Sequence, residues 1–289
     1  MNRMHTLVVI LFAALPLISH AAHQETHPLA ETGSAHYRFG RMTIDSPDGQ
    51  RHYRLDVGVP RKPPATTGYP VMYLLDGNNV MAELQEDWLS ELEAGNPPLL
   101  VMIGYDIDGT YDGEQRTRDY TGATSEAFLQ LIESNIKPVV QAHYSVDRSH
   151  QTLWGHSFGG LFVLSALLQK PEAFQTWFAA SASLWYQPVT FDNGMALTTF
   201  PGTARTVRLI TGEREGKPPI AQFDGGSPER RKAMAAVPRD AHRQLAEHLA
   251  TLPGTDASYQ QFNGRNHGQM FGTALHLGLR RAAGLAEQP

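Results

Sequence analysis

The chain of 289 residues is 41% hydrophobic and 18% charged, which suits one large α/β domain better than two small ones. Its formal net charge of -5 gives no basic field, so we expect no nucleic-acid partner. The absence of cysteine excludes disulfides, Cys-ligated zinc, thiol nucleophiles and a lipidated N-terminal cysteine.

The N-terminus is typical of an export signal. Arg3 supplies a positive charge, residues 7–18 form an apolar run too short for a membrane span, and small residues follow at Ala21 and Ala22. An uncleaved membrane anchor is the alternative, but polar residues follow at once. We therefore expect a cleaved signal peptide at residues 1–21, a single domain at residues 22–289, and a location in the periplasm, which suits a cysteine-free exported chain.

The first expected element is an antiparallel hairpin. Residues 36–45 and 51–60 are strand-like, and the turn sequence Ser-Pro-Asp-Gly at 46–49 joins them.

From residue 69 onward, strand-like runs alternate with helical ones. The expected strands are residues 71–75, 99–105, 151–154, 175–182, 206–211 and 257–262. The expected helices are residues 80–93, 125–144 with a break near 135–138, 158–169, 240–252 and 270–283. Residues 106–122 and 212–238 are expected to be loops, the second either a lid or a plain loop. This alternation predicts a mostly parallel twisted sheet with helices on both faces, in which ligands bind at the carboxyl ends of the strands.

The most informative motif lies at 155–159, Gly-His-Ser-Phe-Gly, between an apolar strand and an apolar helix. This is the G-x-S-x-G nucleophile elbow in the strand-turn-helix context that gives it meaning. Glycines flank the serine because a Cβ would meet the neighbouring backbone. We therefore predict that Ser157 is a nucleophile, ahead of the alternative that it is incidental to a glycine turn.

A serine nucleophile needs a base, and in α/β hydrolases the chain order is Ser, acid, His. Of the later histidines, His242 and His248 are expected on the surface of a helix and His276 within the last helix. His267 lies in the loop between the last strand and the last helix, so we predict that it is the base. His156, beside the serine, is expected to point into the packing between helix and strand.

The acid is expected after the strand at 206–211. Glu215 is the preferred candidate, and Glu213 and Asp240 remain open, as does a backbone carbonyl in place of an acid. The oxyanion hole needs two donors, for which we predict the backbone N–H groups of Phe158 and Asn78. No cofactor and no catalytic metal are expected, because no cluster of metal ligands stands out.

Six motifs together carry a family resemblance. They are LLDG at 74–77, RTRDYT at 116–121, GHSFGGLF at 155–162, SASLW at 181–185, GERE at 212–215 and NHG at 266–268. With them, the chain resembles the putative-esterase family of α/β hydrolases, and within it the periplasmic esterases of enterobactin, a trilactone siderophore. The resemblance implies the α/β-hydrolase fold, with Ser157 as nucleophile and His267 as base. Some siderophore esterases work as a Ser–His dyad, which keeps the role of Glu215 open.

The implied substrate is a catecholate siderophore, apo or ferric, whose ferric complex is anionic. Arginines and aromatic rings would bind it by charge pairing, cation–π contact and stacking. The candidates are Arg116, Arg118, Trp185, Tyr186 and Trp88. The alternative for them is structural: an Arg118–Asp119 ion pair and a core position for Trp185.

Three functions remain open at this point. The preferred one is a periplasmic serine esterase that opens the siderophore trilactone and releases iron. The second is an exported carboxylesterase for feruloyl or simple acyl esters, and the third is a non-catalytic siderophore-binding protein on a hydrolase fold. An association with the inner membrane or with a siderophore transporter is a further hypothesis.

Overall fold

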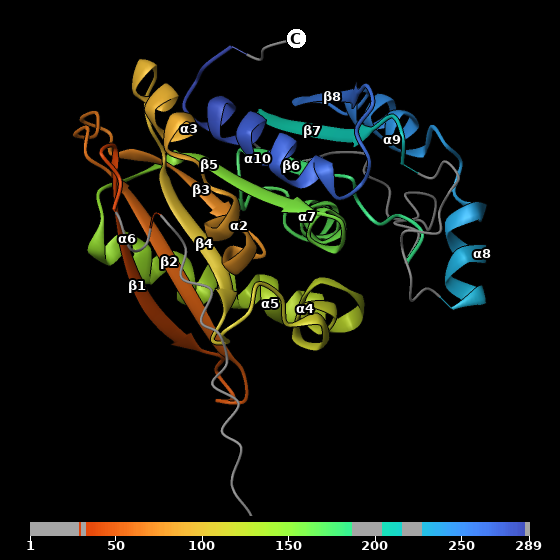
Figure 1. Cartoon of the computed structure of the whole chain (residues 1–289), viewed down its shortest axis with the longest axis horizontal. Coiled ribbons are helices and arrows are strands. Elements are labelled where there is room, and N and C mark those ends of the chain that lie inside the picture. The colour runs from red at the N-terminus through yellow and green to blue at the C-terminus, as the bar shows by residue number, and fades with distance from the viewer. Residues whose placement is uncertain (1–28, 30–32, 187–203, 216–226, 287–289) are drawn as a thin grey trace, which may run out of the picture.

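The computed structural model describes residue 29 and residues 33–186, 204–215 and 227–286. One eight-stranded sheet lies between two layers of helices (Figure 1). The expected signal peptide at 1–21 lies outside the described residues, as does the part of the second expected loop at 216–226.

The sheet begins with an antiparallel hairpin and continues as a parallel sheet. Its strands are β1 (Tyr37–Asp45), β2 (His52–Pro60), β3 (Tyr69–Leu74), β4 (Leu99–Tyr105), β5 (Val146–His156), β6 (Thr176–Ala180), β7 (Arg205–Gly212) and β8 (Thr255–Phe262). Their spatial order is β1-β2-β4-β3-β5-β6-β7-β8. β2 pairs antiparallel with β1 and with β4, and the other neighbours pair in parallel. The predicted fold class is thus confirmed, and β3, β5, β6, β7 and β8 end side by side at one edge.

Helices cover both faces of the sheet. They are α2 (Gly77–Glu83), α3 (Glu86–Glu91), α4 (Gly113–Tyr120), α5 (Ser125–Leu131), α6 (Lys137–His143), α7 (Phe158–Gln169), α8 (Pro228–Ala236), α9 (Ala241–Ala250) and α10 (Gln269–Ala282). The core on one face includes residues of α5, α6, α7 and α9, and the core on the other includes residues of α2, α3 and α10 (Figure 1). None of the described helices has the length and apolar character needed to cross a bilayer.

The central strands are apolar throughout because both of their faces are buried. In β3, Val71 and Tyr73 belong to one core, whereas Met72 and Leu74 belong to the other. A strand with one wet face would alternate apolar and polar side chains instead. The unbroken apolar runs of the sequence therefore place the parallel strands at the centre of the molecule.

Three expected elements differ from the structure. The helix expected at 80–93 is interrupted, because Leu84 takes an extended ψ of 135° after α2 and the chain starts again as α3. The loop expected at 106–122 contains α4, and the loop expected at 212–238 contains α8. The break expected near 135–138 follows a π-helical turn at Ile132–Ile136 that joins α5 to α6.

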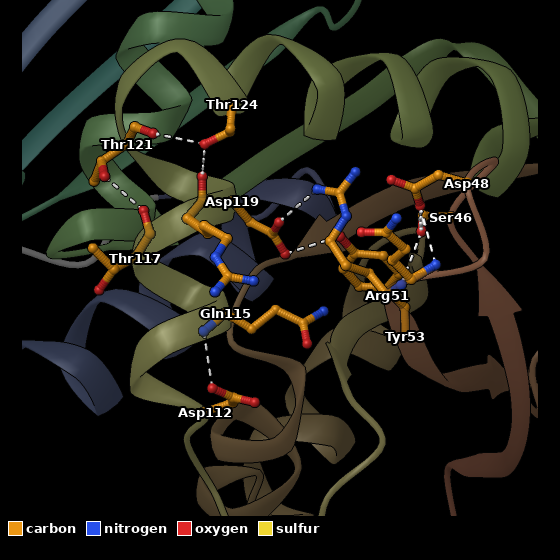
Figure 2. Close-up of polar contacts among 12 residues, drawn as sticks. Ser46, Asp48, Arg51, Tyr53, Asp112, Gln115, Thr117, Asp119, Thr121 and Thr124 are labelled. Atoms are coloured by element: carbon orange, nitrogen blue, oxygen red, sulfur yellow. Dashed lines mark hydrogen bonds and ion pairs between the residues drawn. The ribbon is translucent and has the colours of Figure 1, made fainter.

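Helix α4 escapes sequence-based detection because it buries polar groups. Asp112 caps it by accepting a hydrogen bond from the Gln115 backbone N–H at 2.9 Å, as a helix N-cap does. Its fully buried Asp119 carboxylate accepts from the Arg51 Nη1 at 3.1 Å and from the Tyr53 hydroxyl at 2.9 Å (Figure 2). The alternative pair Arg118–Asp119 is wrong, since the exposed Arg118 pairs with Glu114. Asp119 therefore joins α4 to the N-terminal hairpin.

We expect Asp119→Ala to lower the free energy of unfolding by about 3 kcal/mol, because it leaves the Arg51 charge and the Tyr53 hydroxyl without their acceptor. Urea denaturation measures the change. Arg118→Ala, which removes an exposed pair from the adjacent position, is the matched control and should stay within about 0.5 kcal/mol of wild type. Equal losses in the two variants would contradict the role given to Asp119.

Candidate active site

Ser157 stands at a sharp turn between β5 and α7. Its backbone has φ 60° and ψ -116°, a conformation that residues other than glycine rarely adopt. The turn is tight: a Cβ on Gly155 would lie 2.4 Å from the carbonyl carbon and oxygen of Gly159. Close backbone approach thus explains Gly155, whereas a Cβ on Gly159 would make only ordinary contacts, 3.5 Å from Asp76 and Leu75. Ser157 stays partly exposed at the end of the strand.

His267 follows β8, and its ring contacts Glu215, which follows β7. The Nδ1 of His267 lies 3.2 Å from Oε2 of Glu215, and the two side chains are 24% and 17% exposed. The other carboxylate oxygen, Oε1, accepts from the Ser181 hydroxyl at 2.7 Å and from the Gly212 backbone N–H at 2.5 Å. Burial opposes ionisation, yet the hydrogen bonds from His267, Gly212 and Ser181 hold the pKa of Glu215 below its ordinary value. Glu215 is therefore set to remain a carboxylate and to orient the imidazole.

The other two candidate acids have different partners. Glu213 accepts a hydrogen bond from the Gly264 backbone N–H at 3.0 Å. Asp240, just before α9, pairs with Arg243 at 2.6 Å. Of the three carboxylates that the sequence left open, Glu215 is the one that the structure brings to His267.

The two predicted oxyanion donors lie in the first turns of α2 and α7, which follow the neighbouring strands β3 and β5. Phe158 is the first residue of α7 and Asn78 is the second residue of α2. Backbone N–H groups in a first helical turn have no intrahelical acceptor. The Asn78 side chain is occupied, since Nδ2 donates to the carbonyl of Tyr105 at 3.1 Å and Oδ1 accepts from the Tyr105 N–H at 2.9 Å. These bonds fix the turn after β3 against the end of β4.

Arg116 fastens the turn after β3 to the elbow. Its guanidinium makes two bonds to Asp76, Nε to Oδ1 at 2.5 Å and Nη2 to Oδ2 at 2.9 Å, and Nη2 also donates to the carbonyl of His156 at 3.3 Å. The backbone N–H of Asp76 donates to the Tyr120 hydroxyl at 3.0 Å. Arg116 is predicted to bind substrate. In the structure its guanidinium instead bonds the Asp76 carboxylate and the His156 carbonyl, which flank the predicted oxyanion site.

A group of aromatic side chains borders Ser157. The ring of Phe158, next to Ser157, lies 5.9 Å from that of Trp185 and 4.8 Å from that of Tyr186. The Arg230 guanidinium of α8 lies 4.8 Å above the Trp185 ring. Tyr186 is 39% exposed, so part of this surface is open to a ligand. Trp185 and Tyr186 therefore lie where a substrate at Ser157 would reach them.

Trp88 lies elsewhere, on α3, with its ring against His276 of α10. Its ring stacks on that of His276 at 4.8 Å with an interplanar angle of 6°. Both line a cavity of about 470 Å³ that is also lined by Arg265 and Gly268, from the loop that contains His267. The cavity is thus adjacent to the loop that carries the histidine.

Two further histidines support the site. His156 is buried, and its Nε2 lies 2.9 Å from the backbone carbonyl of His267. Burial lowers the pKa of His156, so its ring is neutral and donates. His242, expected on the helix surface, points inward instead, with Nε2 2.9 Å from the carbonyl of Ala182. An amphipathic pattern could not reveal this, because it treats every histidine as polar.

No cluster of three or more His, Asp or Glu side chains within the described residues is placed to hold a metal ion. The chemistry available to the site is that of a serine hydroxyl, an imidazole and a carboxylate, each just beyond the end of a parallel strand of the sheet. Together, the fold and the site define an α/β hydrolase.

The family model described as "Putative esterase" matches residues 46–280. The chain therefore belongs to this family of carboxylic ester hydrolases. Its curated relatives include the apo-salmochelin esterase of Escherichia coli O6:H1, 36% identical over 208 residues, which are 63% of this chain and 65% of that one. The ferri-bacillibactin esterase BesA of Bacillus subtilis is 31% identical over 83% of this chain and 87% of its own length. The solved "Enterobactin and Salmochelin Hydrolase IroE" superposes with a TM-score of 0.69 at 29% identity, covering 89% of this chain and 99% of that one.

We expect Glu215→Ala to lower kcat about a hundred- to ten-thousandfold, because His267 loses the group that fixes its tautomer and stabilises its protonated form. Hydrolysis of a short p-nitrophenyl ester measures kcat. Glu213→Ala, on the same turn, is the control and should change kcat less than about threefold, in the range of surface changes. A loss below about threefold for Glu215→Ala would instead identify a Ser–His dyad.

The lowered pKa of Glu215 also predicts a pH dependence of stability. A carboxyl group whose pKa is lowered on folding adds stability above its unfolded pKa and loses it as the pH falls through the folded pKa. The unfolding free energies of wild type and Glu215→Gln should therefore differ at pH 7, and this difference should shrink as the pH falls into the acid range. Chemical denaturation at a series of pH values measures this, and a difference that stays constant would contradict the shift.

Proposed function

We propose that this protein is an exported serine esterase that works in the periplasm and hydrolyses the trilactone backbone of an enterobactin-type catecholate siderophore, so that iron is released. The contact between His267 and Glu215 at 3.2 Å, beside the strained Ser157 elbow, carries the proposal for the serine mechanism. The names of the relatives, which are esterases of salmochelin and bacillibactin, support the substrate.

In the first half of the reaction, Ser157 Oγ attacks the carbonyl carbon of a backbone ester. With Nδ1 of His267 turned to Glu215, Nε2 is the nitrogen that takes the serine proton. Negative charge develops on the carbonyl oxygen, where the Phe158 and Asn78 N–H groups and the N-terminal dipoles of two helices stabilise it. The tetrahedral intermediate then expels the seryl oxygen of the lactone, which takes the proton from His267.

In the second half, water attacks the acyl group on Ser157. His267 accepts a proton from the water and returns it to Oγ as the acyl–serine bond breaks. The products are a free carboxylic acid, a free alcohol and the regenerated enzyme. Glu215 stays ionised throughout and stabilises the imidazolium that forms twice in each cycle.

The surface beside Ser157 suits a ring-bearing anionic substrate. Trp185 and Tyr186 offer aromatic faces, and Arg230 adds a positive charge above Trp185. We include Arg118, which is 57% exposed, as a second cation for the ferric complex. A catecholate arm that stacks here would hold its backbone ester at the serine.

Location and partners follow as part of the same proposal. A signal peptide at residues 1–21 would deliver the mature chain to the periplasm, and an association with the inner membrane or a siderophore transporter would place it where the ferric complex arrives. Fractionation of cells that express the full chain, followed by the mass of the mature protein, tests export and cleavage.

We expect Ser157→Ala to abolish hydrolysis of apo and ferric enterobactin while the dissociation constant stays close to that of wild type. The nucleophile is lost, whereas the aromatic and cationic surface is unchanged. Chromatography of the products measures turnover, and quenching of intrinsic fluorescence measures binding. Turnover retained by this variant would overturn the serine mechanism.

Wild-type measurements decide between the substrate classes. The proposal predicts a larger kcat/KM for enterobactin than for short p-nitrophenyl esters and prompt labelling of Ser157 by a fluorophosphonate. Preference for simple or feruloyl esters would favour a general carboxylesterase. Tight siderophore binding without labelling would favour a binding protein.

A further inference from the structure

The segment Ser181–Ser183, directly after β6, passes between the nucleophile and the acid. Backbone bonds fix it on both sides: the Ser157 N–H donates to the carbonyl of Ala180 at 2.9 Å, and the Ser183 N–H donates to the carbonyl of Ser157 at 3.0 Å. The Ser181 N–H donates to the carbonyl of Ile210 in β7 at 2.8 Å. The segment therefore joins the elbow after β5 to the strand that leads to Glu215.

Ser181 acts on the acid through its side chain. Its hydroxyl donates to Oε1 of Glu215 at 2.7 Å, whereas His267 contacts the other oxygen, Oε2. Bonds to both oxygens fix the rotation of the carboxylate. Ser181 is buried and has φ 46°, a left-handed conformation that a residue with a Cβ adopts at a cost. Strain at a residue that contacts the acid is typical of a functional position.

Ser183 acts on the nucleophile. Its hydroxyl oxygen lies 3.2 Å from Oγ of Ser157, and the residue is 3% exposed. A buried hydroxyl at this distance limits the rotamers open to Oγ. Ser181 thus contacts the carboxylate of Glu215, and Ser183 contacts the hydroxyl of Ser157.

His242 holds the middle of the segment from α9. Its Nε2 lies 2.9 Å from the carbonyl oxygen of Ala182, which is itself buried. Burial lowers the pKa of His242, so the ring is neutral and its Nε2–H donates to the carbonyl. The ionisable groups that face this ring are Glu215 and His267. Because this ring bonds the backbone of Ala182, His242 acts on the segment through that carbonyl.

We propose that Ser181 and His242 are positioning residues of the active site: Ser181 orients Glu215, and His242 holds the Ser181–Ser183 segment so that the acid and the nucleophile keep their separation. The proposal rests on the serine-esterase function proposed above. The G-x-S-x-G elbow and the Ser, acid, His order of the fold leave these roles of Ser181 and His242 unassigned.

The variants are chosen so that activity and stability separate. Ser181→Gly removes the hydroxyl and at the same time relieves the backbone, because glycine adopts positive φ without cost. His242→Leu removes the donor and keeps the bulk, and His242→Gln keeps an N–H donor at a similar reach. The controls are Ser258→Gly on β8 and His248→Gln on α9, both at exposed positions.

The readouts are kcat and KM on a short p-nitrophenyl ester, the rate of Ser157 labelling by a fluorophosphonate, and the midpoint of urea denaturation. Ser181→Gly and His242→Leu should each lower kcat and the labelling rate about tenfold, the effect of one lost hydrogen bond, with KM within about twofold. Ser181→Gly should unfold at the wild-type midpoint or above, and His242→Gln should recover kcat to within about threefold of wild type. The control variants should match wild type.

Unchanged kcat in Ser181→Gly and His242→Leu would overturn the proposal. So would a loss in His242→Gln equal to that in His242→Leu, or a change confined to KM. If His242→Leu does not fold, His242→Gln and Ser181→Gly still decide. Absence of labelling in the wild-type protein would instead contradict the proposed function, so the two failures are distinguishable.

Discussion

Within the described residues, the non-glycine positions with positive φ are Asp76, Ser157 and Ser181, and they follow three adjacent strands, β3, β5 and β6. Each such conformation costs about 1–3 kcal/mol and persists only where the surroundings hold it. Here the Asp76 carboxylate accepts two bonds from Arg116, and the Asp76 backbone N–H donates one bond to the Tyr120 hydroxyl. The Ser157 backbone bonds to Ala180 at the end of β6 and to Ser183 just after it. The proposed oxyanion turn, the proposed nucleophile and the serine that supports the proposed acid all lie at this strained edge.

Much of the architecture could be predicted from the sequence because the central strands are buried on both faces. Their apolar runs revealed the alternation of strands and helices, and the parallel order then placed the residues that follow each strand at one edge. The elbow glycines marked Ser157, since a Cβ at 155 would meet the backbone at 159. Glu215 and His267 are candidates because each follows a strand of the parallel sheet, and the structure places their side chains in contact.

The remainder could not be predicted because it depends on polar groups buried by their partners. Helix α4 has no apolar repeat, since Arg116 and Asp119 face inward toward charges from distant parts of the chain. The helical pattern predicts a surface position for His242, whereas the structure bonds it to the carbonyl of Ala182, 60 positions away in the chain. Periodicity reports which side chains avoid water, and it carries no information on a polar side chain that is buried because it has found a partner.

The account of function joins a strained serine, a histidine fixed by a carboxylate and an aromatic surface into one esterase site. Its central claim is that Ser157 becomes acylated by a siderophore lactone. Acid quenching during turnover of enterobactin, followed by intact-mass and peptide mass spectrometry, tests this directly. The account predicts that the peptide containing Ser157 gains the mass of one intact trilactone, because ring opening adds the whole ligand to Oγ and releases nothing. Hydrolysis of the lactone with no adduct on Ser157, or with the adduct on another residue, would contradict it.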